Sequence, residues 1–337
     1  MILIWVILIS VLMGLYALMI FRFMRGWRLF IQGLPLDRIS RGDTEKAELQ
    51  LTVVVTARNE ALRMMPLLEA LANQDFGLAH KGLWEVVWVD DESTDGSAEL
   101  VEAFVREHPE WLCRVLRRNG SDSYASHKKG AVAMGIAAAQ GEWILVTDAD
   151  CVPGSGWCRS MTAPLAGNSS VEFVAGPVRL APCGSLWLKS QAIEFMSLNA
   201  IAASSIAMGQ PIISNGGNMA FRRRTFLALN PYADNMNHPG GDDDLLMHRI
   251  ALAFGPGAVV FCSDPLAMVD TPPVATLRDF LQQRIRWVSK QSAYPDPWVS
   301  GILKAVWLLQ AMMAIGLLAG LAGGSWPVIS WICLGAW

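Results

Sequence analysis

Two hydrophobic patterns alternate along the chain between residues 49 and 150. Short runs rich in β-branched residues predict buried strands, and the stretches between them place apolar residues at helical spacing. The predicted strands are 51–56, 84–89, 115–116 and 143–148, and the predicted helices are 61–72, 97–107 and 131–140. Strands that alternate with helices favour a doubly wound, mostly parallel α/β sheet.

The alternation becomes less regular after residue 153. The pattern predicts a strand at 171–178, a turn at 215–218, a short strand at 219–221 and helices at 185–208, 245–253 and 276–294. The helix at 185–208 carries only Lys189 and Glu194 as charged residues, which is typical of a helix that lies on a membrane surface.

Both ends of the chain are apolar. Residues 1–21 contain no charged side chain, which suffices for the ~20 residues of a membrane span, and Arg22, Arg25 and Arg28 follow at once. Arginines after the apolar run favour an uncleaved anchor and place the following domain in the cytoplasm. Lys304 is the last charged residue. Residues 303–321 are long enough to span a membrane but 326–337 are not, so we expect a truncated chain.

Composition narrows the partners that this chain can have. The 337 residues have a mean hydropathy of +0.32 and a formal net charge of −3. A nucleic-acid partner is not expected, because binding to phosphates needs clustered Lys and Arg. The six cysteines form no Cys-x-x-Cys pair and show no zinc-site spacing. The remaining candidates for chemistry are the acidic residues at the strand ends.

Asp148 and Asp150 lie at the end of the 143–148 strand. Ligands of open α/β sheets bind at the carboxyl ends of strands, so these two carboxylates favour a site for Mg²⁺ or Mn²⁺ carrying a diphosphate. A solvated acidic turn is the alternative.

Asp90 and Asp91 end the 84–89 strand, where a carboxylate can accept a hydrogen bond from a nucleobase N–H or cap the next helix.

Lys128 and Lys129 open the next predicted helix. A helix N-terminus attracts phosphate, although two surface lysines would show the same pattern.

Asp242, Asp243 and Asp244 follow two glycines. Three adjacent acids in a cleft do not all ionise easily, so one of them can serve as a general base, and an acidic helix cap is the alternative.

Gln283 and Arg286 share one face of the 276–294 helix, and Trp287 follows them. The arginine fork suits diphosphate oxygens, and tryptophan suits stacking on a sugar or an apolar acceptor. An amphipathic helix on the membrane, with Trp287 at the interface, is the alternative.

Taken in order, these segments resemble the inverting glycosyltransferases of family two. The resemblance covers roughly residues 49–294. The segments that carry it are Thr56-Ala57-Arg58-Asn59-Glu60, Val89-Asp90-Asp91-Glu92-Ser93-Thr94-Asp95, Lys128, Asp148-Ala149-Asp150, Gly241-Asp242-Asp243 and Gln283-Arg284-Ile285-Arg286-Trp287. It implies a GT-A fold, a nucleotide-diphosphate sugar donor and a lipid-linked or polysaccharide acceptor.

The resemblance also implies a role for each matching residue. Glu60 and Asp91 would hold the nucleoside, Lys128 and Asp148 would lie on the nucleotide side, and Asp148 with Asp150 would hold Mg²⁺ or Mn²⁺. Asp243 would take the proton of the acceptor hydroxyl, which attacks the anomeric carbon with inversion. The catalytic set would be completed by Gln283, Arg286 and Trp287.

Two departures from the family pattern stand out. Asp242 replaces a glutamate, which leaves open which acid of the triplet is the base. One membrane helix on each side is too few for the pore of a processive synthase.

Two other functions would also fit parts of the pattern. They are an inactive GT-A scaffold that binds nucleotide sugar or a partner enzyme, and a dinucleotide-binding oxidoreductase. No Gly-x-Gly-x-x-Gly follows the first strand, which argues against the oxidoreductase.

We therefore expect a multi-pass protein of the inner membrane with four parts. These are a transmembrane anchor at 1–22, a cytoplasmic connector at 23–48, a GT-A domain with interfacial helices at 49–300 and a C-terminal transmembrane region at 303–337.

Overall fold

The computed structural model describes residues 2–33, 51–75, 84–119, 127–233, 241–289, 294 and 297–321. The chain divides into two compact units, one of residues 26–293 and one that joins residues 1–25 to residues 294–337. Each unit is described by itself.

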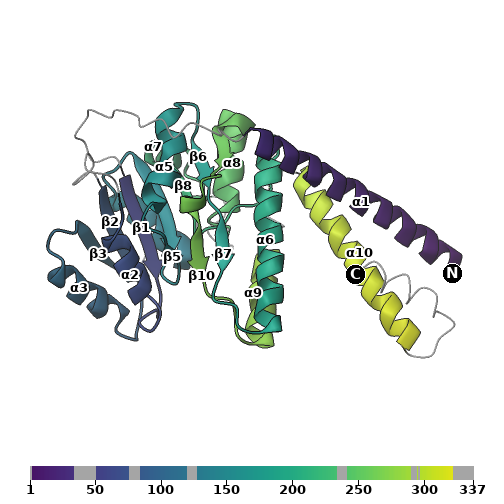
Figure 1. The fold of residues 1–337 in the computed structure, drawn as a ribbon, viewed down its shortest axis with the longest axis horizontal. Coiled ribbons are helices and arrows are strands. Elements are labelled where there is room, and N and C mark those ends of the chain that lie inside the picture. Colours follow the sequence, from purple (N-terminus) through teal and green to yellow (C-terminus); the bar gives the residue numbers. More distant parts are fainter. Residues whose placement is uncertain are drawn as a thin grey trace. The chain divides into compact units, whose positions relative to one another are not determined.

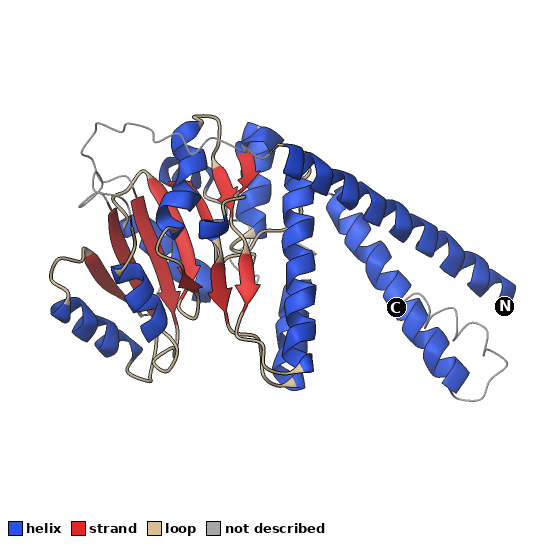
Figure 2. Cartoon of the chain, in the orientation of Figure 1, coloured by secondary structure: helices blue, strands red, loops and turns tan. Residues whose placement is uncertain are grey.

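The helices and strands follow the chain as Figures 1 and 2 show. The helices are α1 (Ile2–Gln32), α2 (Met65–Ala72), α3 (Ser97–Glu107), α4 (His127–Ala138), α5 (Trp157–Gly167), α6 (Leu186–Ala207), α7 (Arg223–Leu229), α8 (Asp244–Phe254), α9 (Leu277–Ser289) and α10 (Pro297–Leu321), with short 3₁₀ turns at Pro256–Ala258 and Pro265–Ala267. The strands are β1 (Leu51–Ala57), β2 (Trp84–Asp91), β3 (Cys113–Arg118), β4 (Trp143–Asp148), β5 (Val152–Pro153), β6 (Phe173–Ala175), β7 (Val178–Leu180), β8 (Met219–Arg222), β9 (Val259–Phe261) and β10 (Val269–Thr271).

In the described part of the chain, the main sheet has seven strands in the order β3-β2-β1-β4-β8-β6-β9. The first four strands are parallel, and Val54 of β1 pairs with Val87 of β2 on one side and with Val146 of β4 on the other. β8 is antiparallel to both of its neighbours. The predicted doubly wound, mostly parallel sheet is therefore confirmed.

Helices cover both faces of this sheet. Val53 and Val55 belong to a core that includes side chains of α2, α3 and α5, whereas Val54 belongs to a core with α4, α7 and α8. Burial on both faces explains why the central strands are apolar throughout instead of alternating with polar residues.

The single strand predicted at 171–178 is wrong, because the chain forms two strands there. β6 belongs to the main sheet and β7 to a smaller sheet in the order β5-β10-β7. Gly176 and Pro177 separate the two strands, and proline cannot donate a ladder hydrogen bond. The helix predicted at 61–72 begins only at Met65, and residues 61–63 form a turn before it.

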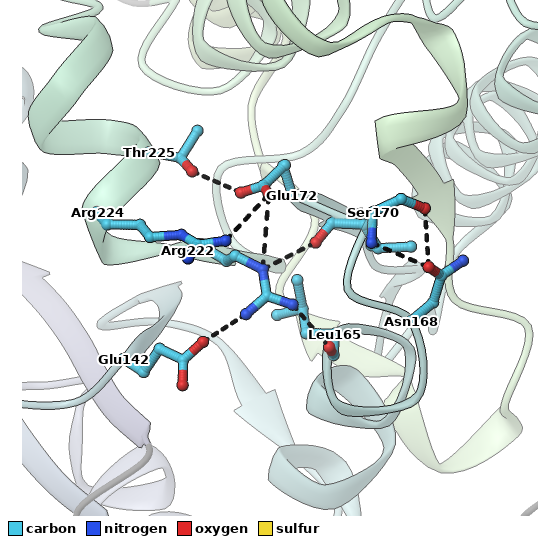
Figure 3. A network of polar contacts seen from close by, with 9 residues as sticks. Glu142, Leu165, Asn168, Ser170, Glu172, Arg222, Arg224 and Thr225 are labelled. Carbon is cyan, nitrogen blue, oxygen red and sulfur yellow. Dashed lines mark hydrogen bonds and ion pairs between the residues drawn. The ribbon is translucent and has the colours of Figure 1, made fainter.

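A buried ion-pair network fixes β8 against its neighbours (Figure 3). Arg222 contacts Glu142 through one terminal nitrogen, donates to the carbonyl of Leu165 at 3.0 Å through the other, and lies 3.7 Å from Glu172 through Nε. Thr225 donates to the second oxygen of Glu172. The Arg222 and Glu172 side chains are only 7% and 6% exposed, so each charge depends on these partners.

We expect Arg222→Met to destabilise the domain strongly. Removing one partner of a buried ion pair leaves the other charge uncompensated, which costs about 3–5 kcal/mol. In a domain of this size the melting temperature should fall by at least about 6 °C in a thermal-shift measurement. Arg224→Met is the matched control, because Arg224 lies 3.6 Å from the same glutamate but is 70% exposed. An equal loss in both variants would contradict the prediction.

The terminal unit contains most of α1 together with α10. Ile9 and Leu12 of α1 form an apolar cluster with Leu309, Met312 and Met313 of α10. Among the described residues, one stretch, Ile7–Gln32, is long and apolar enough to cross a membrane. The helix continues past residue 22, where the anchor was expected to end. Residues 34–48 and 322–337 lie outside the described residues, and the second span stays a prediction.

Candidate active site

Acidic residues follow β1 and β4, which are neighbouring parallel strands. The chain leaves β1 toward β2 on one side and returns as β4 on the other. This reversal creates a topological switch point, and ligands of open α/β sheets bind at the carboxyl edge of such a point. Glu60 follows β1, and Asp148 ends β4 with Asp150 two residues later.

Asp148, Asp150 and Cys151 form a compact group of possible metal ligands. One ligand atom from each side chain lies within 4.8 Å of the others. Burial raises the pKa of Asp150 and the Asp148 carboxylate raises it further, while Arg63 and Lys128 oppose the rise. Burial also raises the pKa of Glu60, although the ion pair that Glu60 forms with Arg63 at 2.9 Å acts to lower it. Carboxylate oxygens that are crowded in this way fit a hard divalent cation such as Mg²⁺ or Mn²⁺.

Lys128 joins this group from the first turn of α4. Its Nζ lies 2.7 Å from Asp148 Oδ1 and 3.3 Å from Asp242 Oδ2. Burial opposes the charge, but the two carboxylates together raise the pKa of Lys128 above its ordinary value. The structure thus places this lysine between acids of two separate segments.

The three adjacent aspartates before and in α8 have different environments. Asp243 is the N-cap, since its Oδ1 accepts the Asp244 N–H at 2.7 Å and its Oδ2 accepts the Gly216 N–H at 3.2 Å. Asp244 is fully buried and accepts the N–H of Ser214 at 2.7 Å. Asp242 is buried and contacts Lys128. The acidic cap that was the alternative to a general base therefore exists, and Asp243 provides it and not Asp242 or Asp244.

The turn at 215–218 lines the site with backbone, which the sequence analysis missed. A Cβ on Gly216 would lie 3.0 Å from Asp242 Oδ2, and one on Gly217 would lie 3.0 Å from Cys151 Sγ and 3.6 Å from Asp148 Oδ2. Thr147 donates to the carbonyl of Gly217 at 2.9 Å. Two consecutive glycines before a short strand signal such a close backbone approach.

Asn218 anchors this turn in the core. Its side-chain amide is fully buried, donates to the carbonyls of Pro177 and Ala267 at 2.8 Å each, and accepts the Trp157 indole N–H at 2.9 Å. Three hydrogen bonds satisfy five polar atoms in one place, so the turn is held rigidly between the acids of β4 and those before α8.

Asp90 and Asp91 at the end of β2 have different partners. Asp91 forms a buried ion pair with Arg118 of β3 at 2.5 Å, and Arg58 lies 4.0 Å from its second oxygen. Asp90 Oδ2 accepts the Ser93 N–H at 3.2 Å, while its Oδ1 is buried without a hydrogen-bond partner among the described residues. The sequence does not reveal Arg118 as a partner of Asp91, because only strand pairing brings the two residues together.

The loops after β1 and β2 are joined by side-chain hydrogen bonds. Ser93 Oγ accepts the Asn59 N–H, and Ser97 Oγ accepts the Glu60 N–H, both at 2.9 Å. The polar residues after Asp91 thus support the loop that carries Glu60. Asp95 also accepts the Ser97 N–H at the start of α3, although the N-cap of this helix is Gly96, which has no side-chain cap.

Gln283, Arg286 and Trp287 lie on α9, which is held against α6. Arg284 forms a bidentate ion pair with Glu194 at 3.0 and 2.6 Å, and its guanidinium lies 4.1 Å from the Trp287 ring centre. Gln283 accepts a hydrogen bond from Arg284 at 2.7 Å, whereas Arg286 is exposed. Among the described residues, the side chains of this motif contact α6 and other residues of α9, and no contact joins them to the acids at the carboxyl edge of the sheet.

Comparison with known proteins places this arrangement in a family. The model of "Glycosyl transferase family 2" matches residues 52–228, which is more than half of the chain. The chain belongs to glycosyltransferase family 2. The matched segment contains Glu60 after β1 and the strands β2 and β4, which end in Asp91 and Asp148. The predicted family is confirmed.

Curated relatives match a part of this family 2 glycosyltransferase. The dolichyl-phosphate beta-glucosyltransferase of Dictyostelium discoideum is 30% identical over 105 residues, which is 30% of this chain and 31% of the relative. The dolichol-phosphate mannosyltransferase of Saccharomyces cerevisiae is 33% identical over 103 residues, which is 30% of this chain and 36% of the relative. The chain thus aligns with about a third of the length of these relatives.

Solved structures show the same GT-A fold. Mannosyltransferase PcManGT from Pyrobaculum calidifontis, in complex with GDP-Man and Mn²⁺, superposes with a TM-score of 0.67 at 22% identity and covers 98% of this chain and 91% of its own. Glucosyl-3-phosphoglycerate synthase from Mycobacterium tuberculosis, in complex with Mn²⁺ and UDP, gives a TM-score of 0.51 at 19% identity over 75% and 83% of the two chains. The predicted fold class is confirmed.

Proposed function

We propose that this glycosyltransferase is membrane-bound and inverting, and that it moves a sugar from a nucleotide-diphosphate donor to a lipid-linked or polysaccharide acceptor. The observation that carries the proposal is the bridge from Asp148 through Lys128 to Asp242 at the switch point of the sheet. This bridge joins the acids expected to hold a cation and a diphosphate to the segment expected to supply the base.

A lipid-linked acceptor is favoured over a soluble one. The curated relatives are named for dolichyl-phosphate substrates, and the stretch Ile7–Gln32 has the length and composition of a membrane span. The exposed apolar residues Leu186, Ile193 and Met196 along α6 fit the membrane-surface helix expected from the sequence. We place the catalytic domain on the cytoplasmic side because Arg22, Arg25 and Arg28 follow the apolar run.

The nucleotide side of the site is assigned to residues at the ends of β1, β2 and β4. Asp148 and Asp150 would hold Mg²⁺ or Mn²⁺, which when bound offsets the charge of the diphosphate. Glu60 and Asp91 would orient the nucleoside, with Arg118 holding the Asp91 carboxylate in place. Lys128 and Arg286 would contact diphosphate oxygens.

The acceptor side is assigned to Asp243 and to the helix α9. An acceptor hydroxyl gives its proton to Asp243 while its oxygen attacks the anomeric carbon, whereas an acceptor phosphate attacks through an oxygen that carries no proton. In both cases the bond to the diphosphate oxygen breaks on the opposite face. Nucleoside diphosphate leaves, and the configuration at the anomeric carbon is inverted. Gln283 and Trp287 would shape the surface on which the acceptor lies.

A test of this function compares acceptors with the purified full-length protein. Nucleoside diphosphate release from GDP- and UDP-sugars should rise above the rate with water when a polyisoprenyl phosphate or a polysaccharide fragment is added. NMR of the product should show the anomeric configuration opposite to that of the donor. Donor binding without release would favour the inactive scaffold, and a retained configuration would overturn the inverting mechanism.

The Arg286 and Trp287 assignments predict different losses. Arg286→Ala should lower release about 10²-fold for every acceptor, including water, because charge on the departing diphosphate is left uncompensated. Trp287→Ala should impair transfer more than donor hydrolysis. Ile285→Ala is the control, since Ile285 is 68% exposed on the same helix. Equal losses in both assays for both variants would make α9 a purely structural element.

A further inference from the structure

Lys128 lies where a cation is needed. Its ammonium is 2.7 Å from Asp148, at the end of β4, and 3.3 Å from Asp242, in the turn before α8. The Asp242 side chain is 7% exposed, whereas those of Lys128 and Asp148 are 35% and 34% exposed. One ammonium therefore compensates a proposed metal ligand and a buried acid at the same time.

The surrounding backbone leaves room for this bridge. A Cβ on Gly216 would lie 3.2 Å from Lys128 Nζ and 3.0 Å from Asp242 Oδ2. The Gly216 φ angle lies outside the left-handed region, so space and not backbone conformation requires glycine at this position.

Lys129, the next residue of α4, differs from Lys128 in the exposure of its side chain. It is fully buried, and burial lowers the pKa of Lys129 while the Asp242 and Asp243 carboxylates oppose that lowering. Asp242 therefore has a second lysine within electrostatic reach besides Lys128. Lys128 is partly exposed on a long flexible stem, so it is the exchangeable cation of the pair.

We propose that Lys128 is a built-in counter-ion that occupies the acid cluster before metal binds, releases Asp148 when a divalent cation enters, and then contacts the donor diphosphate. The proposal rests on the proposed function. Two cations cannot share the Asp148 carboxylate without repulsion, so metal entry displaces the ammonium. The released charge lies beside the place where a diphosphate would bind, and an ammonium is a good partner for phosphate oxygens.

Substitution of Lys128 should strengthen metal binding and weaken nucleotide binding. Lys128→Met keeps the stem but removes the competing charge, so the full-length protein should bind Mn²⁺ alone roughly tenfold more tightly. With saturating Mn²⁺, the same variant should bind GDP or UDP roughly tenfold more weakly. Lys128→Arg keeps the charge and should retain weak Mn²⁺ binding. Isothermal titration calorimetry measures both affinities without any turnover.

Arg63→Met is the matched charge control. Arg63 also lies near the acids, through Glu60 and the field at Asp150, but its side chain is 56% exposed and its contact is to Glu60. A smaller gain in Mn²⁺ affinity for Arg63→Met than for Lys128→Met supports the bridge. Equal gains would overturn it, because they would reflect net charge alone. Lys128→Gln serves the same comparison if the methionine variant does not fold.

The outcomes separate this inference from the proposed function. A wild-type protein that binds neither Mn²⁺ nor a nucleoside diphosphate would refute the proposed function. A wild-type protein that binds both, with a Lys128→Met variant that binds Mn²⁺ no more tightly, would refute the counter-ion alone. A loss of both affinities would show a structural role for Lys128 and would also overturn the inference.

Discussion

Replacing Asp243 with asparagine should lower sugar transfer to a hydroxyl acceptor by ~10²–10⁴-fold while donor binding persists, because a positioned general base contributes about that factor. Both Asp243 oxygens accept backbone N–H groups, from Asp244 at 2.7 Å and Gly216 at 3.2 Å. These bonds fix the orientation of the carboxylate and leave it further lone pairs for a proton. Asparagine keeps the shape and one accepting oxygen for the N-cap, but its amide nitrogen cannot accept the second N–H and the side chain cannot accept the proton.

The neighbouring aspartates provide the controls for this result. Asp244→Asn alters a fully buried acid that accepts the Ser214 N–H, so it should affect stability more than chemistry. Asp242→Asn alters the acid that faces Lys128. Rates of release and transfer are measured together with donor binding and the melting temperature. A dead Asp242→Asn variant beside an active Asp243→Asn variant would move the base by one residue and leave the mechanism intact.

The fold could be predicted from the sequence where local signals agree with burial. α3 spans Ser97–Glu107 as predicted, because its apolar spacing and its polar entry are both local features. The signal failed at β6 and β7, where an apolar run from Val171 to Val178 belongs to two sheets. Periodicity shows that such residues are buried, but it does not show which strand they pair with.

Some residues of the candidate site could be predicted from the sequence, and others are brought to it only by the fold. The acids at strand ends were visible because charge after an apolar run is rare without a reason, and the structure brings Glu60, Asp148 and Asp150 together. Arg118 was not visible, because only the pairing of β2 with β3 brings it to Asp91. The turn at Gly216 appeared as an ordinary loop, since its contacts come from residues distant in sequence.

Removal of divalent metal should abolish turnover, and added Mg²⁺ or Mn²⁺ should restore it. The reason is the crowding of negative charge at the end of β4. Burial and the neighbouring Asp148 already raise the pKa of Asp150, so a diphosphate could not approach these acids without an intervening cation. Nucleoside diphosphate release is measured in excess chelator, with metal content verified by elemental analysis, and again after the metal is returned.

Substitution of a single ligand distinguishes this site from a general effect of chelation. Asp150→Asn removes one charged oxygen ligand, so the Mn²⁺ affinity should fall by at least roughly 10-fold, and activity should return at higher metal concentration. Glu110→Gln makes the same charge change at an exposed position. Glu110 precedes β3 and so lies at the amino ends of the strands, away from the acids at their carboxyl ends, and its substitution should leave the metal titration unchanged. Undiminished release in verified metal-free protein would refute the metal assignment of Asp148 and Asp150. A shifted metal titration for Asp150→Asn alone would tie the requirement to the acids at the end of β4.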